Sequence, residues 1–252
     1  MSGFAPWKEQ KIVVTGATSG IGKAITQLLL AQGATVFGVG RSLEKLEAMQ
    51  IEYPDKLKLH QADLLNLQVA RGLMTAARDA MGGVSGLFVA AGAIEHQSFG
   101  TIDDESWARQ MNLNLRVPTI LLEEALAVVE PNSSAVLLGS TLGAHPIATS
   151  TAYSAAKAGL EAVVKVAAMA GAQKGLRVNL LHPGVVDTPM IRSTERPDDL
   201  SADDRIQELA ALHLLGRVGQ PEELAQVAVD ILKWTFATGS IVTVDGGLSI
   251  QA

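Results

Sequence analysis

Short apolar runs alternate along this chain with segments in which apolar residues recur at helical spacing. Seven runs are predicted as strands: 11–15, 34–39, 57–60, 86–90, 133–140, 176–182 and 240–244. Helical spacing is found between them, near 20–32, 43–50, 66–81, 104–129, 151–174 and 221–234. Strands joined through helices run parallel with right-handed crossovers, which places helices on both faces of the sheet. We therefore predict a doubly wound α/β fold with a seven-stranded parallel sheet.

The length and composition agree with one domain spanning residues 1–252. Sheets of this kind and size commonly form a single domain with a large core. Hydrophobic residues make up 48% of the chain and aromatic residues only 4%, so Ala, Val, Ile and Leu fill the core. Such residues suit parallel strands that are covered on both faces.

Charge and cysteine content exclude several classes of function. With 20 basic and 26 acidic residues the net charge is −6, and no Lys/Arg cluster stands out, so nucleic acid is not an expected partner. The chain has no cysteine, which rules out disulfides and thiolate metal sites and fits a reducing compartment, so we expect a cytoplasmic protein. Residues 1–10 lack the apolar core of a signal peptide, and no run approaches the ~18 apolar residues of a membrane span.

A glycine-rich turn joins the first predicted strand to the first predicted helix. The turn reads Gly16-Ala17-Thr18-Ser19-Gly20-Ile21-Gly22, a G-x-x-x-G-x-G variant of the usual G-x-G-x-x-G. In such a turn, backbone N–H groups approach a pyrophosphate, and the helix N-terminus supplies positive potential. The order of strand, turn and helix predicts a dinucleotide site in a Rossmann-type domain.

A second motif combines a serine with a tyrosine and a lysine. Tyr153 follows Ser140 by thirteen positions, and Lys157 follows Tyr153 by four. A spacing of four puts two side chains on one face of a helix, so the Lys157 ammonium would lie beside the Tyr153 phenol. A nearby cation favours the ionised phenol, and we therefore expect a lowered pKa for Tyr153 and a role in proton transfer.

Together these motifs resemble those of the classical short-chain dehydrogenase/reductase family, from Lys11 to Gly247. Thr15-Gly16-x-x-x-Gly20-x-Gly22, Asp63-Leu64 and Ala91-Gly92 resemble its cofactor motifs, as do Pro183-Gly184-Val185-Val186-Asp187-Thr188 and Val244-Asp245-Gly246-Gly247. Asn114, Ser140, Tyr153 and Lys157 match the family's catalytic tetrad. The cofactor-binding residues that the resemblance implies are Gly16, Ser19, Gly20, Ile21, Gly22, Arg41, Ser42, Asp63, Leu64, Ala90, Ala91, Gly92, Tyr153, Lys157, Pro183, Gly184, Val186 and Thr188.

The resemblance implies an oxidoreductase that interconverts a ketone or aldehyde and an alcohol by hydride transfer. Tyr153 would be the general acid/base, Lys157 would activate it and hold the nicotinamide ribose, and Ser140 would bind the substrate oxygen. Asn114 would anchor a water, with neighbouring Asn112 as the competing candidate. The alternative function is a non-catalytic sensor of nicotinamide redox state.

Two positions bear on the cofactor. The family usually has an asparagine where this chain has Ala90, so altered cofactor affinity is expected. An NAD-preferring member generally carries an acidic residue where Gly40 stands, whereas here Arg41 follows, and a guanidinium binds the 2′-phosphate of NADP. We therefore expect a preference for NADP(H), with Ser42 and Ser19 as added donors and NAD(H) as a possible substitute.

The substrate pocket implied by the family combines polar and apolar residues, and two interpretations stay open. Its residues here are Ile94, Glu95, His96, Leu142, Gly143, His145, Pro146, Met190 and Ile191. Glu95 and the histidines would recognise hydroxyls or a carboxylate, whereas the aliphatic residues suit an apolar ring. Residues 190–220 interrupt the alternation and are predicted as a loop over the site, with a short helix near 203–213. No ligand spacing accompanies the histidines, so no metal site is expected.

Helix 151–174 carries small residues on more than one face. Among them are Ala155, Ala158, Gly159, Ala162 and Ala170. A face of this kind allows a second helix to approach closely, and family members commonly form dimers and tetramers there. We expect a homo-oligomer that acts on a small molecule.

Overall fold

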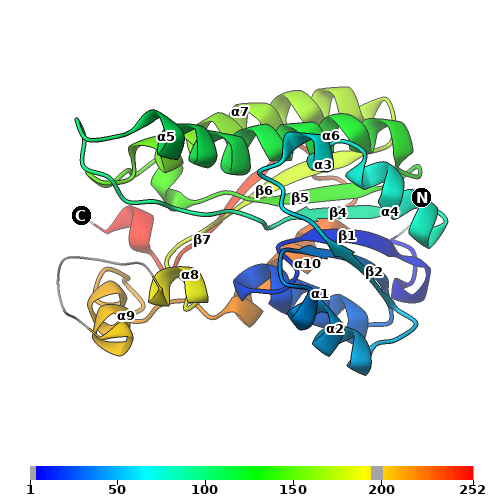
Figure 1. Cartoon of the computed structure of the whole chain (residues 1–252), viewed down its shortest axis with the longest axis horizontal. Coiled ribbons are helices and arrows are strands. Elements are labelled where there is room, and N and C mark those ends of the chain that lie inside the picture. The colour runs from blue at the N-terminus through cyan, green and yellow to red at the C-terminus, as the bar shows by residue number, and fades with distance from the viewer. Residues whose placement is uncertain (1–3, 194–200, 252) are drawn as a thin grey trace.

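The computed structural model describes residues 4–193 and 201–251, and within them one parallel sheet has the strand order β3-β2-β1-β4-β5-β6-β7. Its strands are β1 (Lys11–Thr15), β2 (Thr35–Gly40), β3 (Leu57–Gln61), β4 (Gly86–Val89), β5 (Ser134–Leu138), β6 (Arg177–Pro183) and β7 (Ile241–Val244). All six neighbouring pairs are parallel. The predicted α/β fold and its seven strands are confirmed, with strand ends that differ by at most two residues (Figure 1).

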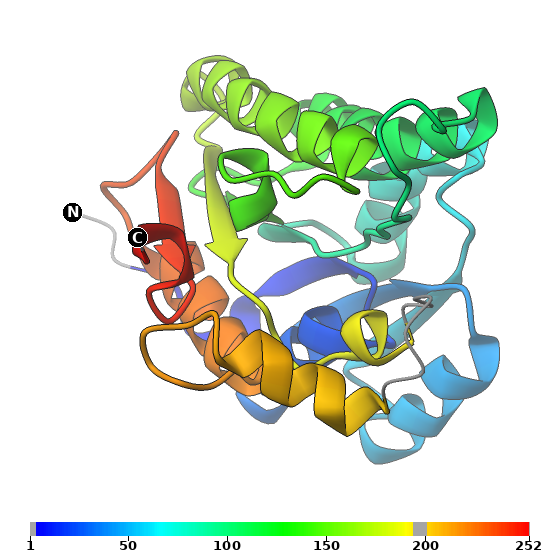
Figure 2. The ribbon, with the colours of Figure 1, turned by 90° about the vertical axis from the view of Figure 1, so that its left-hand side faces the viewer.

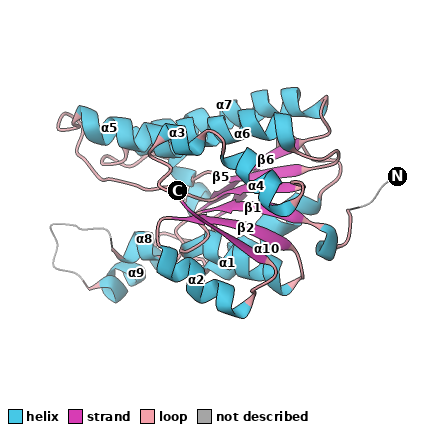
Figure 3. Ribbon diagram, turned by 45° about the vertical axis from the view of Figure 1, so that its right-hand side comes forward, coloured by secondary structure: helices cyan, strands magenta, loops and turns pink. Residues whose placement is uncertain are grey.

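Helices cover both faces of this sheet, as Figure 3 shows. Their bounds are α1 (Gly20–Ala31), α2 (Leu43–Glu52), α3 (Leu67–Ala70), α4 (Leu73–Met81), α5 (Asp104–Met111), α6 (Val117–Val128), α7 (Thr151–Ala172), α8 (Pro189–Arg192), α9 (Ala202–Ala210) and α10 (Pro221–Lys233). Short 3-10 turns lie at Trp7–Glu9, Thr141–Gly143 and Leu248–Ile250.

Two hydrophobic clusters, one on each face of the sheet, hold the helices against the strands. Alternate residues of a strand point to opposite faces, so Val13 joins one cluster while Ile12 and Val14 join the other. The first cluster includes apolar residues of α4, α6 and α7, and the second includes those of α1, α2 and α10. Both contain many residues with no exposed surface, as expected for strands buried on two sides.

Two predicted helices are interrupted. The segment 66–81 is split into α3 and α4, because Arg71 is extended and Gly72 has a φ of +90°, a conformation that glycine adopts readily. The segment 104–129 contains a π-helical turn, Asn112–Arg116, between α5 and α6. Pro118 lies two residues beyond this turn and has no N–H to donate, which disfavours regular α-helical hydrogen bonding there.

The strand order places a topological switch point between β1 and β4. From β1 the chain moves outward to β2 and β3, and then returns to β4 on the other side of β1. In open α/β sheets, ligands bind beyond the carboxyl ends of the strands at such a point. Helices α8 and α9 lie beyond that edge, in front in Figure 2, and form part of the predicted loop 190–220. Residues 194–200 of that loop lie outside the described residues.

Candidate active site

The glycine-rich turn at the end of β1 brings two backbone segments into close contact. Gly16 and Gly20 have φ values of +71° and +49°, which disfavour residues with side chains. A Cβ on Gly22 would lie 2.4 Å from the Gly16 carbonyl oxygen, so this position also requires glycine. The first turn of α1 has no acidic residue, and Ser19 makes no side-chain cap to its N–H groups. These donors are therefore suited to an anion such as a phosphate.

Other predicted cofactor residues surround this turn. A Cβ on Gly16 would lie 2.9 Å from the Ala91 nitrogen, and one on Gly20 would lie 3.0 Å from the Thr188 Cγ2. The N–H groups of Ala90 and Ala91 both donate to the Thr15 hydroxyl, at 3.2 Å. Thr15 thus attaches the end of β4 to β1, although Ala90 has no side-chain amide. The segment Pro183–Gly184 is held to the end of β7, because the Gly184 N–H donates to the Val244 carbonyl at 3.1 Å.

The predicted adenosine side lies at the ends of β2 and β3. Arg41 is exposed, and Ser42 caps α2 by accepting a hydrogen bond from the Lys45 N–H. Asp63 uses Oδ1 to accept the Leu65 N–H at 3.0 Å. The side chains of Leu64 and Val186 are buried in the two hydrophobic clusters, so these residues offer their backbone and not their side chains to a ligand.

Ser140, Tyr153 and Lys157 come together at the carboxyl edge of β5. Ser140 follows β5, whereas Tyr153 and Lys157 project from α7, and all three are buried. The Ser140 and Tyr153 side chains are hydrogen-bonded to each other. Lys157 Nζ lies 5.5 Å from the centroid of the Tyr153 ring and donates to the Leu138 carbonyl at 2.8 Å. The spacing of four along a helix therefore places the amine beside the phenol, as predicted.

The pKa prediction for Tyr153 is wrong for this structure. Burial raises the pKa of Tyr153 to about 12, and the hydrogen bond with Ser140 only partly opposes this rise. Burial also lowers the pKa of Lys157 to about 8. Both shifts have one cause, since removal from water disfavours the charged phenolate and the charged ammonium alike.

Asn114 lies in the π-helical turn and has no exposed surface. Its Nδ2 donates to the carbonyls of Ala93 and Gln110, at 2.8 and 2.9 Å, and its Oδ1 accepts the Ala93 N–H at 3.3 Å. A Cβ on Gly92 would lie 2.9 Å from Asn114 Oδ1 and 3.8 Å from Lys157 Nζ. The asparagine and the lysine therefore both border the space that the missing side chain of Gly92 leaves.

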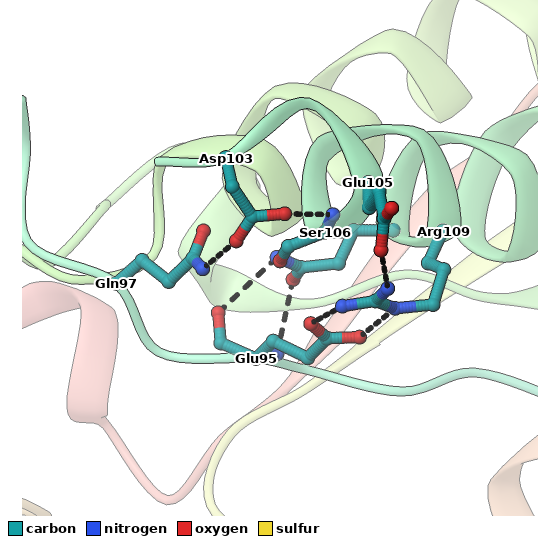
Figure 4. A network of polar contacts seen from close by, with 7 residues as sticks. Glu95, Gln97, Asp103, Glu105, Ser106 and Arg109 are labelled. Carbon is teal, nitrogen blue, oxygen red and sulfur yellow. Dashed lines mark hydrogen bonds and ion pairs between the residues drawn. The ribbon is translucent and has the colours of Figure 1, made fainter. Parts of the chain in front are cut away.

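The loop after β4 is fastened to α5 by the polar network of Figure 4. Glu95 receives two hydrogen bonds from Arg109, at 3.0 and 2.8 Å. Gln110 accepts the Glu95 N–H at 3.1 Å and donates to its carbonyl at 3.2 Å. Arg109 pairs with the Glu95 carboxylate, so a substrate recognised by Glu95 would have to share that carboxylate with Arg109, and this use of Glu95 stays a prediction. His96 contacts the Thr149 hydroxyl at 3.0 Å, and His145 is exposed.

Two residues that support this site, Gln110 and His182, were not among the predicted site residues, and Thr15 was named only as part of the cofactor turn. His182 is buried at the end of β6, and its Nδ1 accepts the Ser140 N–H at 2.8 Å. The signal in the sequence is weak, since a histidine before a proline has many structural uses. Only the adjacency of β5 and β6 shows that it faces Ser140.

The described residues offer neither a metal cluster nor a membrane-spanning helix. In residues 4–193 and 201–251, no cluster of three or more His, Cys, Asp or Glu could hold a metal ion. No helix in the same part of the chain is both long and apolar enough to cross a bilayer.

Comparison with known proteins identifies the family. Residues 16–249 match a family model described as enoyl-(acyl carrier protein) reductase. Cyclohexanol dehydrogenase of Acinetobacter sp. (strain SE19) is 33% identical over 249 residues, which cover 93% of this chain and 92% of the relative. The chain belongs to the short-chain dehydrogenase/reductase family.

Two other members broaden this comparison. The 3-oxoacyl-[acyl-carrier-protein] reductase FabG of Thermotoga maritima is 29% identical, with 94% of this chain and 97% of the relative covered. The structure of a blue fluorescent protein from a metagenomic library, in complex with NADPH, has a TM-score of 0.87 and 26% identity. That match covers 97% of this chain and 100% of the other. As a member of this family, the protein is an oxidoreductase that binds NAD(P)(H) and acts on CH–OH groups of small molecules.

Proposed function

We propose that this chain is a single-domain, NADP(H)-dependent oxidoreductase that interconverts a ketone and a secondary alcohol, with Tyr153 as general acid/base. The observation that carries the proposal is the buried contact of Ser140, Tyr153 and Lys157 beside the glycine-rich turn. Tyr153 and Ser140 would offer a proton donor and a hydroxyl to a single substrate oxygen, and Lys157 adds a cation beside the phenol.

A nicotinamide nucleotide fits the residues at this edge. Gly16, Gly20 and Gly22 carry no side chains, so the backbone of the turn can approach a phosphate closely, and the first turn of α1 begins at the same place with its N–H groups uncapped by Ser19. Thr188 and Gly92 would flank the nicotinamide end. When bound, the nucleotide supplies or accepts the hydride.

Each of the three buried side chains then has a distinct role. The Tyr153 phenol, whose raised pKa keeps it protonated at neutral pH, would donate its proton to the carbonyl oxygen during reduction. The Ser140 hydroxyl would hydrogen-bond the same oxygen and stabilise its developing charge. Lys157 would hold the ribose and keep a positive charge near the phenol, and Asn114 would anchor a water that links Lys157 to solvent.

A preference for NADP(H) is supported by the end of β2. A Cβ on Gly40 would lie 2.8 Å from Thr18 Cγ2 and 2.9 Å from Thr18 Oγ1, so an acidic side chain there would require Thr18 to move. Arg41 makes no ion pair among the described residues, and Gln61 donates to its carbonyl at 3.0 Å, which holds the backbone at this point. The guanidinium and the N-terminus of α2 both favour a phosphate.

An alicyclic ketone or alcohol is the substrate class that we propose. The relative that is 33% identical is named for cyclohexanol, and the aliphatic residues of the expected pocket suit such a ring. Since Arg109 pairs with Glu95, a polar substrate would have to share this carboxylate with the ion pair, which favours the apolar interpretation. The FabG relative makes a 3-oxoacyl thioester the competing substrate to be tested.

We also propose that α7 forms an interface with a second copy of this chain, in the cytoplasm. Its outer face exposes Ala155, Ala158, Ala162, Val166 and Met169, the last two with 61% and 68% exposed surface. Hollows of about 370 and 530 Å³ lie along the same face, the first beside Met169 and the second beside Ala155 and Ala158. Small side chains let the α7 helices of two copies approach closely.

Nicotinamide absorbance tests the activity directly. Purified protein should oxidise NADPH with cyclohexanone, and Tyr153→Phe should lower kcat by about 1,000-fold or more while NADPH still binds. The panel should include a 3-oxoacyl thioester, since turnover of that compound alone would contradict the substrate class. Tight NADPH binding with no turnover of any carbonyl compound would favour the redox sensor.

A further inference from the structure

A buried histidine lies directly behind Ser140. His182 occupies the carboxyl end of β6, and its Nδ1 accepts the Ser140 backbone N–H at 2.8 Å. A Cβ on Gly139 would lie 2.5 Å from that Nδ1, so the contact depends on a glycine at position 139. The His182 imidazole therefore occupies the space that a side chain at position 139 would need.

The opposite nitrogen of the same ring faces a carboxylate. His182 Nε2 lies 3.3 Å from Glu161 Oε1, and Glu161 follows Lys157 by one turn of α7. Nδ1 must be unprotonated to accept the Ser140 N–H, so the neutral ring carries its proton on Nε2, toward Glu161. This contact is electrostatic, because Nε2 has no partner with hydrogen-bond geometry.

Ser140 needs a fixed backbone because its hydroxyl has two neighbours to satisfy. Its Oγ accepts the Leu142 N–H at 3.1 Å and is hydrogen-bonded to Tyr153. If the Ser140 N–H lost its acceptor, it would be a buried unsatisfied donor, which favours displacement of the residue.

We propose that His182 is a positioning residue for Ser140 and that Glu161 holds its imidazole in the tautomer that accepts the Ser140 N–H. The inference rests on the proposed function, in which Ser140 binds the substrate oxygen. A protonated ring would direct an N–H of its own toward the N–H of Ser140, so the arrangement requires neutral His182.

The surrounding charges set the pH range of this arrangement. Burial lowers the pKa of His182 below its ordinary value of 6.5, while Glu161 opposes this effect and Lys157 adds to it. His182 is therefore mostly neutral at pH 6.5. Its positioning of Ser140 is lost only as the pH falls through the lowered pKa of His182. Replacement of Glu161 by glutamine removes the opposing charge and should move this loss to still lower pH.

Two substitutions at position 182 separate positioning from packing. His182→Asn offers Oδ1 in place of Nδ1, whereas His182→Leu fills the space without an acceptor. Since a buried donor would lose its partner, His182→Leu should lower kcat about 10- to 100-fold with little change in the KM for NADPH. His182→Asn should recover most of that loss. Because asparagine does not titrate, the kcat of this variant should not show the fall at low pH that protonation of His182 causes in the wild-type protein. Equal losses in the two variants would contradict the proposal.

A double-mutant cycle shows whether the effect passes through Ser140. In a Ser140→Ala background, His182→Leu should change kcat by less than about twofold at pH 7, because the hydroxyl that His182 positions is gone. Fully additive losses would overturn the proposal. A nitrogen-15 measurement on the wild-type protein does not depend on the folding of His182→Leu.

A nuclear magnetic resonance measurement is independent of turnover. Nitrogen-15 shifts of His182 at pH 7 should show an unprotonated Nδ1 and a protonated Nε2, and the Ser140 amide should be protected from exchange. A proton on Nδ1 would refute the positioning role even if the enzyme reduces cyclohexanone. If His182 shows the expected tautomer but the protein turns over none of the substrates, the result would count against the proposed function alone.

Discussion

Lys157 is a charged group whose surroundings favour its neutral form. Its side chain is 4% exposed, and burial lowers its pKa from the ordinary 10.5 to about 8. Between about pH 8 and pH 10.5 the unfolded chain binds more protons than the folded one, so the free energy of unfolding rises with pH through this range. Below pH 8 the buried ammonium costs about 3 kcal/mol, at about 1.4 kcal/mol per pKa unit. Tyr153 acts in the opposite sense, because its raised pKa makes stability fall between about pH 10 and pH 12.

Lys157→Met should abolish turnover and stabilise the protein at pH 7. Removal of the buried charge should raise the free energy of unfolding by up to about 3 kcal/mol. Loss of the hydrogen bond that Lys157 donates to the Leu138 carbonyl should lower it by about 1 kcal/mol. Urea unfolding at pH 7 should show a net gain of about 1–2 kcal/mol that shrinks toward pH 10.5. Lys165→Met, an exposed lysine on the same helix, should show no such gain. A less stable Lys157→Met variant at pH 7 would refute the argument.

Arg41 should decide between the two nicotinamide nucleotides. Loss of a charge-assisted contact to a phosphate costs about 1.5–3 kcal/mol, so Arg41→Ala should lower kcat/KM for NADPH about 10- to 100-fold and leave NADH nearly unchanged. Arg78→Ala, an exposed arginine on α4, serves as the control. Equal or better use of NADH by the wild-type protein would reject the NADP(H) preference.

At the scale of elements, the unit from β1 through the glycine turn to α1 depends on backbone contact. The Gly16 carbonyl lies where a Cβ of Gly22 would be, and Gly16 itself is against Ala91 at the end of β4. The turn therefore connects the helix to two strands at once. Helix propensity alone would favour alanine at position 22 by about 1 kcal/mol, because glycine is a poor helix former.

Gly22→Ala should nevertheless destabilise the protein, because the backbone clash outweighs the gain in propensity. Overpacking of this kind costs about 1–3 kcal/mol, and displacement of the turn should weaken NADPH binding at least about tenfold. Urea unfolding and NADPH fluorescence titration provide the two measurements. Lys23→Ala, at the next and exposed position of α1, should alter neither quantity. Unchanged NADPH affinity in Gly22→Ala would show that the turn does not hold the nucleotide.

At the scale of the whole molecule, helix α7 packs on the sheet with one side and presents an apolar side to solvent. Helix α7 spans 22 residues, and its inner face supplies Leu160, Val164 and Ala168 to one hydrophobic cluster. Its outer face stays apolar and exposed, as Val166 and Met169 show. An exposed stripe of this length is what a symmetric pair of helices would bury.

Ala162→Glu should convert the expected oligomer into a smaller species. A twofold interface would bring two unpaired carboxylates together, so dissociation should increase by about two orders of magnitude or more. Light scattering should record at least a halved mass at micromolar concentration. Ala48→Glu adds the same charge to an exposed position of α2 and should leave the mass unchanged. A wild-type monomer would refute the α7 interface outright.

The features that could be predicted from the sequence are those set by residues close together in the chain, and those set by long-range contacts could not be predicted. The strands of the sheet, the glycine-rich turn and the pairing of Tyr153 with Lys157 follow from periodicity and spacing, which act between near neighbours. The break at Gly72 and the π-helical turn at Asn112–Arg116 were missed, since apolar periodicity continues through both.

By itself, the sequence determined the fold class, the position of the glycine-rich turn and the spacing of Tyr153 and Lys157, because each depends on residues close together in the chain. Only the tertiary structure decided that Arg109 engages Glu95, that burial raises the pKa of Tyr153, and that His182 supports Ser140 from 42 residues away. These outcomes depend on the exclusion of water and on strand adjacency, which arise only when β5 and β6 pair in the sheet.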